Sequence, residues 1–269
     1  MSRAYKRLNY EWVNNGSRSL IILFQSAGRI TPPDLQRILD GTIGEAELEA
    51  LHGQFTWKKF SLSYPSADYL FIKDYFSHSY GWYVMDSGQY IHSELNMELE
   101  HFLAEKAYDR VIAYGSSKGG TASLLYGMLN RYITHVFALV PQIEIARYWR
   151  KYLSEHVHLI LGSVDPKRKE LGLNSLLSSH EVRQHVEGTQ FYTYTGVKDD
   201  QFRQIMKFHR EWTGPAAHNL IVNTSPLRHT PLVSENTDFL YETLRSFVEA
   251  RPIADPRLVD AGGGTQMLV

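Results

Sequence analysis

The sequence predicts an α/β fold in which helices flank a mostly parallel β-sheet. Short apolar runs alternate with longer amphipathic stretches along most of the chain, which is typical of strands that are each followed by a helix. Of the 269 residues, 43% are hydrophobic and 21% are charged, enough apolar material for one large core. We therefore expect a single domain over residues 1–250, with a helical insertion or lid at 29–54 and a loose tail at 251–269.

The first elements are expected to be strands that lead into the insertion. Tyr10–Val13 and Ser19–Phe24 flank Asn14-Asn15-Gly16, and this predicts a hairpin because Asn-Gly suits a tight turn. Thr31-Pro32-Pro33 is typical of a helix start, and it opens the stretch at 29–54 where the strand–helix alternation breaks down.

The remaining elements follow from the period of the apolar residues. Strands are expected at Phe55–Leu62, Tyr69–Lys73, Arg110–Tyr114, His135–Val140, His156–Leu161, Gln190–Thr195 and Leu220–Val222. Helices are expected at Ile91–Leu103, Gly119–Asn130, Gln142–Leu153 and Phe202–Trp212, and after a cap at Ser234. Beyond Ala250, prolines and a run of three glycines predict the loose tail.

Composition excludes several classes of protein. The net charge of −1 provides no basic field for nucleic acid, and the absence of cysteine excludes disulfides, thiolate zinc sites and cysteine nucleophiles. The longest apolar runs have five residues, whereas a membrane span needs about 20. The basic start leads into no apolar segment, so we expect no secretory signal and a cytoplasmic location.

The most informative segment is Gly115-Ser-Ser-Lys-Gly119, which contains the pattern G-x-S-x-G between an apolar strand and an amphipathic helix. A nucleophile at the tip of such a strand-to-helix turn adopts a strained backbone, and glycines two residues away avoid a clash. The pattern and its context predict an α/β-hydrolase-like nucleophile elbow at Ser117. The other interpretations are a closely packed glycine turn and a phosphate-binding loop. A phosphate-binding loop has its lysine after the last glycine, whereas Lys118 comes before Gly119 and Gly120.

A serine nucleophile needs a histidine base, which in this fold comes late in the chain. His229 directly follows the last expected strand of the sheet and precedes the last helix, so we expect it to be the base. The earlier histidines lie at strand starts or within expected helices. A solvated loop histidine is the alternative role for His229.

Three aspartates are candidates for the acid that orients the histidine. Asp199 and Asp200 follow the strand that ends near Thr195, whereas Asp165 follows the apolar run before it. Consecutive strands joined by one helix are usually neighbours, which favours Asp199 or Asp200 beside His229. We prefer Asp199 because the position of Asp200 is typical of a helix N-cap. Asp165 and Asp200 are the alternatives.

The oxyanion of the reaction needs two backbone donors. We expect them to be the N–H groups of Lys118 and of Gln25, which follows an early strand; a plain turn at Gln25 is the alternative.

Substrate-binding candidates come from two places. A polar and aromatic cluster contains Asp74, His78 and Trp82, and a basic helix carries Arg147; a packed loop and a solvated helix face are the other interpretations. His156-Val-His158 has the spacing of two metal ligands, but no third ligand accompanies it, and we expect no metal and no cofactor.

At these residues the chain resembles the XcbB/CpsF-type capsular polysaccharide biosynthesis proteins, which are similar to an acetyltransferase-like component of bacterial accessory secretion systems. The likeness covers roughly residues 10–250. It is carried by Gly115-Ser-Ser-Lys-Gly-Gly120, Val140-Pro-Gln142, Gly196-Val-Lys-Asp199, His229, Phe24-Gln25-Ser26 and Leu70-Phe-Ile-Lys-Asp74. The resemblance implies an α/β-hydrolase fold with Ser117, Asp199 and His229 as the triad, and a role in adding or removing acyl groups on a glycan.

The sequence thus predicts a serine acyl hydrolase or acyltransferase that acts on a small-molecule or glycan ester. Two alternatives belong to other classes. One is a transferase that binds a sugar nucleotide or phosphosugar at the glycines of the elbow, and the other is a non-catalytic protein that binds a glycan or a partner. The oligomeric state is not indicated.

Overall fold

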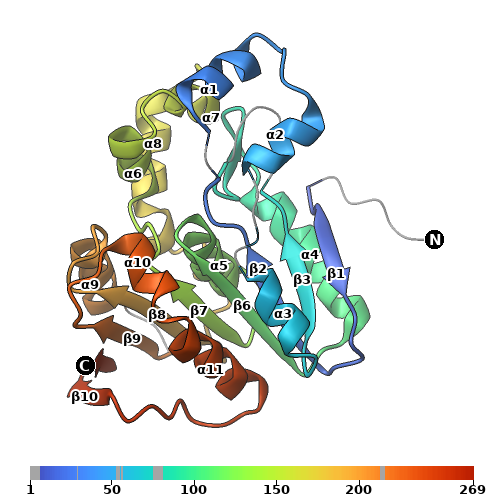
Figure 1. Ribbon diagram of the computed structural model, residues 1–269. Helices are drawn as coiled ribbons and strands as arrows, with labels where there is room; N and C mark the ends of the chain where they lie inside the picture. Colours follow the sequence, from blue (N-terminus) through green and yellow to red (C-terminus); the bar gives the residue numbers. More distant parts are fainter. Residues whose placement is uncertain (1–6, 29, 53–54, 56, 75–80, 213–215) are drawn as a thin grey trace.

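The computed structural model describes residues 7–28, 30–52, 55, 57–74, 81–212 and 216–269. Its centre is a nine-stranded sheet with the strand order β1-β3-β2-β6-β7-β8-β9-β11-β10 (Figure 1). Neighbouring strands from β3 to β11 pair in parallel, and an antiparallel strand closes each end of the sheet. The expected α/β fold with a mostly parallel sheet is therefore confirmed.

The elements have the following bounds. The strands of the large sheet are β1 (Tyr10–Val13), β2 (Ser19–Phe24), β3 (Asp68–Ile72), β6 (Arg110–Ser116), β7 (His135–Leu139), β8 (Gln190–Gly196), β9 (His218–Asn223), β10 (Leu258–Gly262) and β11 (Thr265–Leu268), and a separate pair consists of β4 (Met85–Asp86) and β5 (Gln89–Tyr90). The helices are α1 (Pro32–Leu39), α2 (Glu45–His52), α3 (Lys58–Ser63), α4 (His92–Lys106), α5 (Lys118–Leu129), α6 (Ile145–Tyr152), α7 (Val157–Leu161), α8 (Pro166–Ser175), α9 (Phe202–Arg210), α10 (His229–Ser234) and α11 (Thr237–Val248), with a short 3₁₀ turn at Leu176–Ser178.

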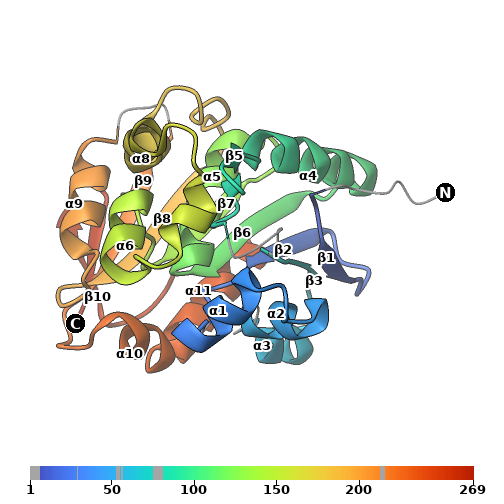
Figure 2. The same ribbon diagram turned by 90° about the horizontal axis from the view of Figure 1, so that it is seen from above.

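Helices cover both faces of the sheet, which explains why the inner strands are apolar on both sides. Successive residues of a strand point to opposite faces, so Leu20 and Ile22 pack in one core cluster and Ile21 and Leu23 in the other. The first cluster includes the apolar sides of α4 and α5, and the second includes those of α3 and α11. Figure 2 shows these two pairs of helices on opposite sides of the sheet.

Helix α5 is the most deeply buried helix, and glycines allow its close approach to the sheet. All twelve of its residues are buried. A Cβ atom on Gly119 would lie 2.4 Å from the carbonyl oxygen of Phe24, and one on Gly115 would lie 2.5 Å from the backbone carbon of Gly119. Both glycines of the G-x-S-x-G pattern are therefore required by the contact between β2, β6 and the first turn of α5.

Several sequence-based expectations about individual elements are wrong. Tyr10–Val13 and Ser19–Phe24 do not form a hairpin, because β3 lies between β1 and β2 and pairs with both. The expected strand at Phe55–Leu62 is instead helix α3 over its later part, and the apolar run at His156–Leu161 is helix α7. In short apolar runs the period does not distinguish a strand from a buried helical turn, and tertiary packing decides.

The expected loose tail is also wrong for residues 258–268. Strands β10 and β11 form an antiparallel hairpin, and β11 extends the sheet by pairing in parallel with β9. The run Gly262–Gly264 lies at the turn, where all three glycines have positive φ, a conformation that glycine adopts without strain. The glycines that suggested disorder in the sequence are turn residues of a sheet edge.

The segment 29–54, which we expected to be an insertion or lid, contains helices α1 and α2 in its described residues, and α1 begins after Thr31 as its start signals predict. Thr31 accepts a hydrogen bond from the Asp34 N–H, and the Asp34 carboxylate accepts one from the Thr31 N–H, which is a capping box. Figure 1 shows both helices outside the central sheet. None of the helices in the described ranges has the length and apolar character that crossing a membrane requires.

Candidate active site

Ser117 occupies the turn between β6 and α5 with φ of 55° and ψ of −118°. This region of backbone space is unfavourable for a residue with a side chain, and strain of this kind is often found at functional sites. The Ser117 N–H donates to the carbonyl oxygen of Leu139 at the end of β7, which holds the turn in place. The hydroxyl is thereby presented at the carboxyl edge of the sheet.

The side chains of Ser117, His229 and Asp199 form a hydrogen-bonded row. His229 Nε2 lies 3.0 Å from Ser117 Oγ, and His229 Nδ1 lies 3.1 Å from Asp199 Oδ1. The three residues are far apart in the sequence and come from the ends of β6, β8 and β9. Because β8 and β9 are hydrogen-bonded neighbours, the loops that follow them meet at one edge.

The Asp199 carboxylate is buried and oriented by its own loop. Its side chain has no exposed surface, whereas that of His229 is 26% exposed. Oδ1 accepts a hydrogen bond from the Gln201 N–H at 3.0 Å, and Oδ2 lies 3.3 Å from the Thr195 hydroxyl, which donates to it. These donors leave Oδ1 directed at the imidazole, which suits a carboxylate that selects one histidine tautomer.

The two alternative acids lie elsewhere. Asp165 is the N-cap of α8, where its carboxylate accepts from the Arg168 N–H. Asp200 accepts a hydrogen bond from the Tyr152 hydroxyl at 3.0 Å. The structure therefore brings neither of them into the row with Ser117 and His229.

A pocket with a volume of about 420 Å³ opens beside Ser117 and His229. Its apolar wall comes from the residue that precedes α3, from α6, α10 and α11, and from the loops that follow β2 and β7. The side chains of this wall are Ala27, Trp57, Val140, Tyr148, Val233 and Tyr241. Polar residues also line the pocket, namely Ser26, Ser116, Ser117, His229, Thr230, Ser234 and Thr237. A concave site that combines an apolar wall with polar groups is typical of sites for small ligands.

The expected backbone donor at Gln25 is wrong. The Gln25 N–H donates to the Tyr83 hydroxyl at 2.6 Å, and both residues are buried. Tyr83 in turn donates to the carbonyl oxygen of Ile72. The loop after β2 does reach the site, but it contributes Ser26 and Ala27 to the pocket wall, one and two residues beyond the expected position.

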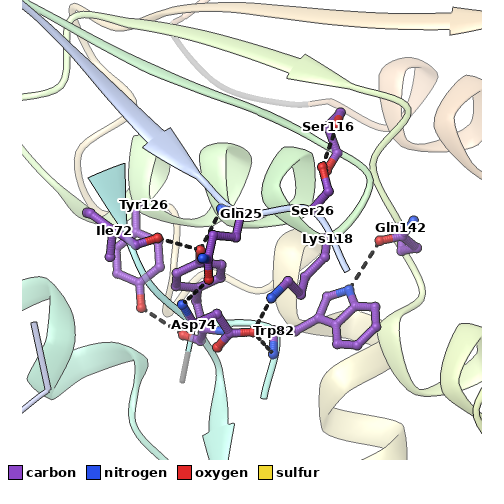
Figure 3. Close-up of polar contacts among 10 residues, drawn as sticks. Gln25, Ser26, Ile72, Asp74, Trp82, Ser116, Lys118, Tyr126 and Gln142 are labelled. Carbon is purple, nitrogen blue, oxygen red and sulfur yellow. Dashed lines mark hydrogen bonds and ion pairs between the residues drawn. The ribbon is translucent and has the colours of Figure 1, made fainter. Parts of the chain in front are cut away.

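A buried ion pair lies behind the serine turn (Figure 3). Lys118 Nζ is 2.7 Å from Asp74 Oδ2, and neither side chain has exposed surface. Asp74 also accepts the backbone N–H groups of Trp82 and Tyr83 at 3.1 and 3.0 Å, and its own N–H donates to the Gln25 side chain. Burial lowers the pKa of Lys118, while the adjacent Asp74 carboxylate raises it.

Of the expected substrate-binding residues, the three that the structure describes do not line the pocket. Asp74 and Trp82 are fully buried in the network behind the turn. Arg147 is exposed on α6 and pairs with Glu144. His78 lies outside the described residues. Trp82 nevertheless connects to the site, because its indole N–H donates to the Gln142 side-chain oxygen at 3.1 Å.

Gln142 is a site residue to which the sequence reasoning assigned no role. Its side-chain nitrogen lies 2.8 Å from Ser117 Oγ. The available signal was its place just after β7, the strand beside β6, because residues at the carboxyl ends of neighbouring strands meet. Within the described residues, no group of three or more His, Asp or Glu side chains is placed to hold a metal ion.

No protein-family model matches the chain, and no curated protein matches it in sequence. Solved structures share its fold. A capsule O-acetyltransferase of Neisseria meningitidis serogroup A, in complex with CoA, matches with a TM-score of 0.63 and 14% identity over 91% of this chain and 93% of that chain. An esterase from Pyrococcus furiosus matches with a TM-score of 0.54 and 14% identity over 91% and 87% of the two chains.

A chain of the glycosylation-associated Gap123 complex from Streptococcus agalactiae matches with a TM-score of 0.61 and 12% identity. The match covers 88% of this chain, which spans only 44% of the length of that neighbour. The chain thus has an α/β fold similar to that of an O-acetyltransferase, an esterase and a glycosylation-associated protein.

Proposed function

We propose that the protein is a serine-dependent acyl hydrolase or acyltransferase in which Ser117 is the nucleophile, His229 the base and Asp199 the orienting acid. The observation that carries this proposal is the row of two hydrogen bonds, 3.0 and 3.1 Å long, that joins Ser117 Oγ to His229 and His229 to Asp199. A serine hydroxyl is a weak nucleophile at neutral pH unless a base removes its proton. The fold shared with an O-acetyltransferase and an esterase supports the same reading.

The reaction follows from this arrangement. Ser117 Oγ gives its proton to His229 Nε2 and forms a bond to the carbonyl carbon of the ester, whose π electrons move onto the carbonyl oxygen. Collapse of this intermediate breaks the ester C–O bond, and the leaving alcohol takes the proton from His229. Asp199 stabilises the imidazolium between the two steps. Water or a second hydroxyl then takes the acyl group from the serine by the reverse sequence.

The substrate is proposed to be an acylated glycan or a related ester. Two of the structural neighbours are named for capsule O-acetylation and for glycosylation, which favours a carbohydrate as acyl acceptor or acyl carrier. The apolar wall of the pocket suits the acyl part of the substrate, because burial of apolar surface contributes about 25 cal/mol per Å². The sugar-nucleotide alternative is less favoured, because the ammonium of Lys118 is paired with Asp74 and buried behind the turn.

Covalent labelling tests the proposal directly. A fluorophosphonate should modify the wild-type protein at Ser117, identified by peptide mass spectrometry, and Ser117→Ala should abolish both labelling and turnover of p-nitrophenyl acetate. Ser123→Ala is the control, because Ser123 is a nearby serine within α5 whose buried hydroxyl donates to the Gly119 carbonyl oxygen of its own helix. Labelling of the wild type at another residue, or none at all, would contradict the proposal.

The same assay separates hydrolysis from transfer. Adding an oligosaccharide with free hydroxyls should yield an acetylated oligosaccharide if the serine ester is passed to a sugar. Release of acetate alone would indicate a hydrolase.

A further inference from the structure

Ser117 Oγ contacts a second side-chain nitrogen besides that of His229. The amide nitrogen of Gln142 lies 2.8 Å away, closer than the 3.0 Å to the imidazole. Gln142 lies in the loop after β7, and its relative exposure is 0%. A buried amide that points at the hydroxyl is not part of the Ser–His–Asp row, and it therefore needs an explanation of its own.

The orientation of this amide follows from its neighbours. The indole nitrogen of Trp82 can only donate a hydrogen bond, and it lies 3.1 Å from one of the two terminal atoms of the Gln142 side chain. That atom must therefore be the carbonyl oxygen Oε1, which accepts the bond. The NH₂ group then faces Ser117 (Figure 3 shows the contact with Trp82). The Thr121 hydroxyl accepts the Gln142 N–H at 2.9 Å and lies 3.0 Å from the Gln142 carbonyl oxygen, which fixes the backbone as well.

The proposed serine reaction needs a hydrogen-bond donor close to Ser117 Oγ. Catalysis of acyl transfer depends on hydrogen bonds to the oxygen that becomes negative, and two donors usually supply them. The backbone N–H of Gln25, the donor expected from the sequence, is occupied by the Tyr83 hydroxyl at 2.6 Å. The Gln142 amide is a fixed and water-excluded donor that lies within hydrogen-bond distance of the reacting atom.

We propose that Gln142 is a catalytic residue whose side-chain amide donates first to Ser117 Oγ and then to the oxyanion of the tetrahedral intermediate. This inference rests on the proposed serine mechanism and adds a fourth residue to it. In the resting site the Ser117 hydroxyl donates to His229 Nε2, and its lone pair accepts from Gln142.

The role of the amide changes as the reaction proceeds. When the proton moves to His229, negative charge grows on Oγ, and the hydrogen bond from Gln142 strengthens because one of its partners is now charged. After Oγ has bonded to carbon, the charge lies on the former carbonyl oxygen, which is joined to Oγ through that single carbon. The amide has two N–H groups, so it can donate to this oxygen without leaving Trp82.

The test variant is Gln142→Met, which keeps the length of the side chain and removes the donor. We expect kcat/KM for p-nitrophenyl acetate, and the rate constant of fluorophosphonate inactivation, to fall by about 10²–10³-fold, the effect of losing one oxyanion donor elsewhere. Gln204→Met is the matched control, because Gln204 is a half-buried glutamine on α9 that accepts a bond from the Glu144 N–H. It should retain the wild-type rate.

A second variant covers the case in which Gln142→Met does not fold. Trp82→Phe leaves Gln142 in place but removes the shorter of the two hydrogen bonds to Gln142 Oε1, the other being 3.4 Å long and donated by the Thr121 hydroxyl. The amide then rotates more easily and can present its oxygen to Ser117. We expect kcat to fall by about tenfold while KM changes little, because only a fraction of the molecules then hold the productive orientation. An unchanged kcat in folded Trp82→Phe would count against the assigned orientation.

The outcomes for Gln142 and for the serine mechanism are distinguishable. If the wild type is neither labelled nor active, the serine mechanism fails first. If the wild type is active and folded Gln142→Met retains its rates to within about threefold, only the role of Gln142 is overturned, because the loss of a real donor is much larger. A lower melting temperature with unchanged kinetics would show that Gln142 acts only in packing.

Discussion

The buried pair of Lys118 and Asp74 gives a prediction whose size follows from the structure. In Asp74→Asn the shape of the site is kept, but the carboxylate 2.7 Å from Lys118 Nζ is lost. The ammonium has no exposed surface, and burial already lowers its pKa, so without Asp74 we expect Lys118 to lose its proton in the folded state. In the unfolded state its pKa returns to about 10.4.

The loss of folding free energy in Asp74→Asn follows from the different protonation of Lys118 in the folded and unfolded states. Removing a proton at pH 7 from a group with a pKa of about 10.4 costs about 1.36 kcal/mol for each of about 3.4 units, or about 5 kcal/mol. This is a large part of the 5–15 kcal/mol by which a typical domain is stable. Asp74→Asn should therefore unfold at a much lower urea concentration than the wild type at pH 7.

The stability of Asp74→Asn should also depend on pH, and it should rise as the pH is raised. Without Asp74 the pKa of Lys118 is lowered further in the folded state, so the unfolded variant binds more protons and its stability rises with pH until the pH approaches about 10.4. The slope is at most about 1.4 kcal/mol per pH unit. Between pH 7 and 9 the variant should recover at most about 2.7 kcal/mol relative to the wild type. Urea unfolding followed by far-UV circular dichroism at both pH values measures this directly.

Two controls separate this explanation from a general loss of packing. Glu47→Gln removes one partner of the exposed Arg37–Glu47 pair and should change stability by less than about 1 kcal/mol with no added pH slope. The double variant Lys118→Met with Asp74→Asn should be more stable at pH 7 than Asp74→Asn alone, since no buried charge is left unpaired. Equal pH slopes in Asp74→Asn and wild type would refute the reasoning.

The remaining predictions concern the triad, the turn and a buried histidine. Asp199→Asn should fold normally and lose about four orders of magnitude in kcat because it favours the wrong tautomer of the base, whereas the exposed neighbour Asp200→Asn should keep its rate. Steady-state kinetics of both variants decide, and a wild-type kcat in folded Asp199→Asn would exclude Asp199 as the acid. Gly119→Ala should be strongly destabilised or insoluble because its Cβ would lie 2.4 Å from the Phe24 carbonyl oxygen, and a wild-type melting temperature would show that the turn can relax. Burial lowers the pKa of His218 to about 3, so the unfolded state binds more protons below about pH 6.5 and stability should fall as the pH is lowered from 6.5 towards 3; a thermal-unfolding series should show this loss, which His218→Gln should reduce.

The sequence alone determined the parts of this protein that depend on local rules. The period of the apolar residues predicts the parallel strands from β6 to β9 and the helices α5, α6 and α9, because buried strands and amphipathic helices differ in period. The spacing Gly115, Ser117, Gly119 predicts the turn, since only glycine fits the close contacts there. The order of strands along the chain was enough to favour Asp199 over Asp165 as the partner of His229.

Which groups are left available at the site depends on contacts between distant parts of the chain. The Gln25 N–H is taken by Tyr83, a residue 58 positions away, and the Gln142 amide is turned towards Ser117 by Trp82. The same holds at the sheet edges, where β3 enters between β1 and β2 and the glycine-rich C-terminal residues pair with β9. The period of the apolar residues indicates which residues are buried. The hydrogen-bond partner of a buried group depends instead on which distant donors and acceptors the fold brings close to it.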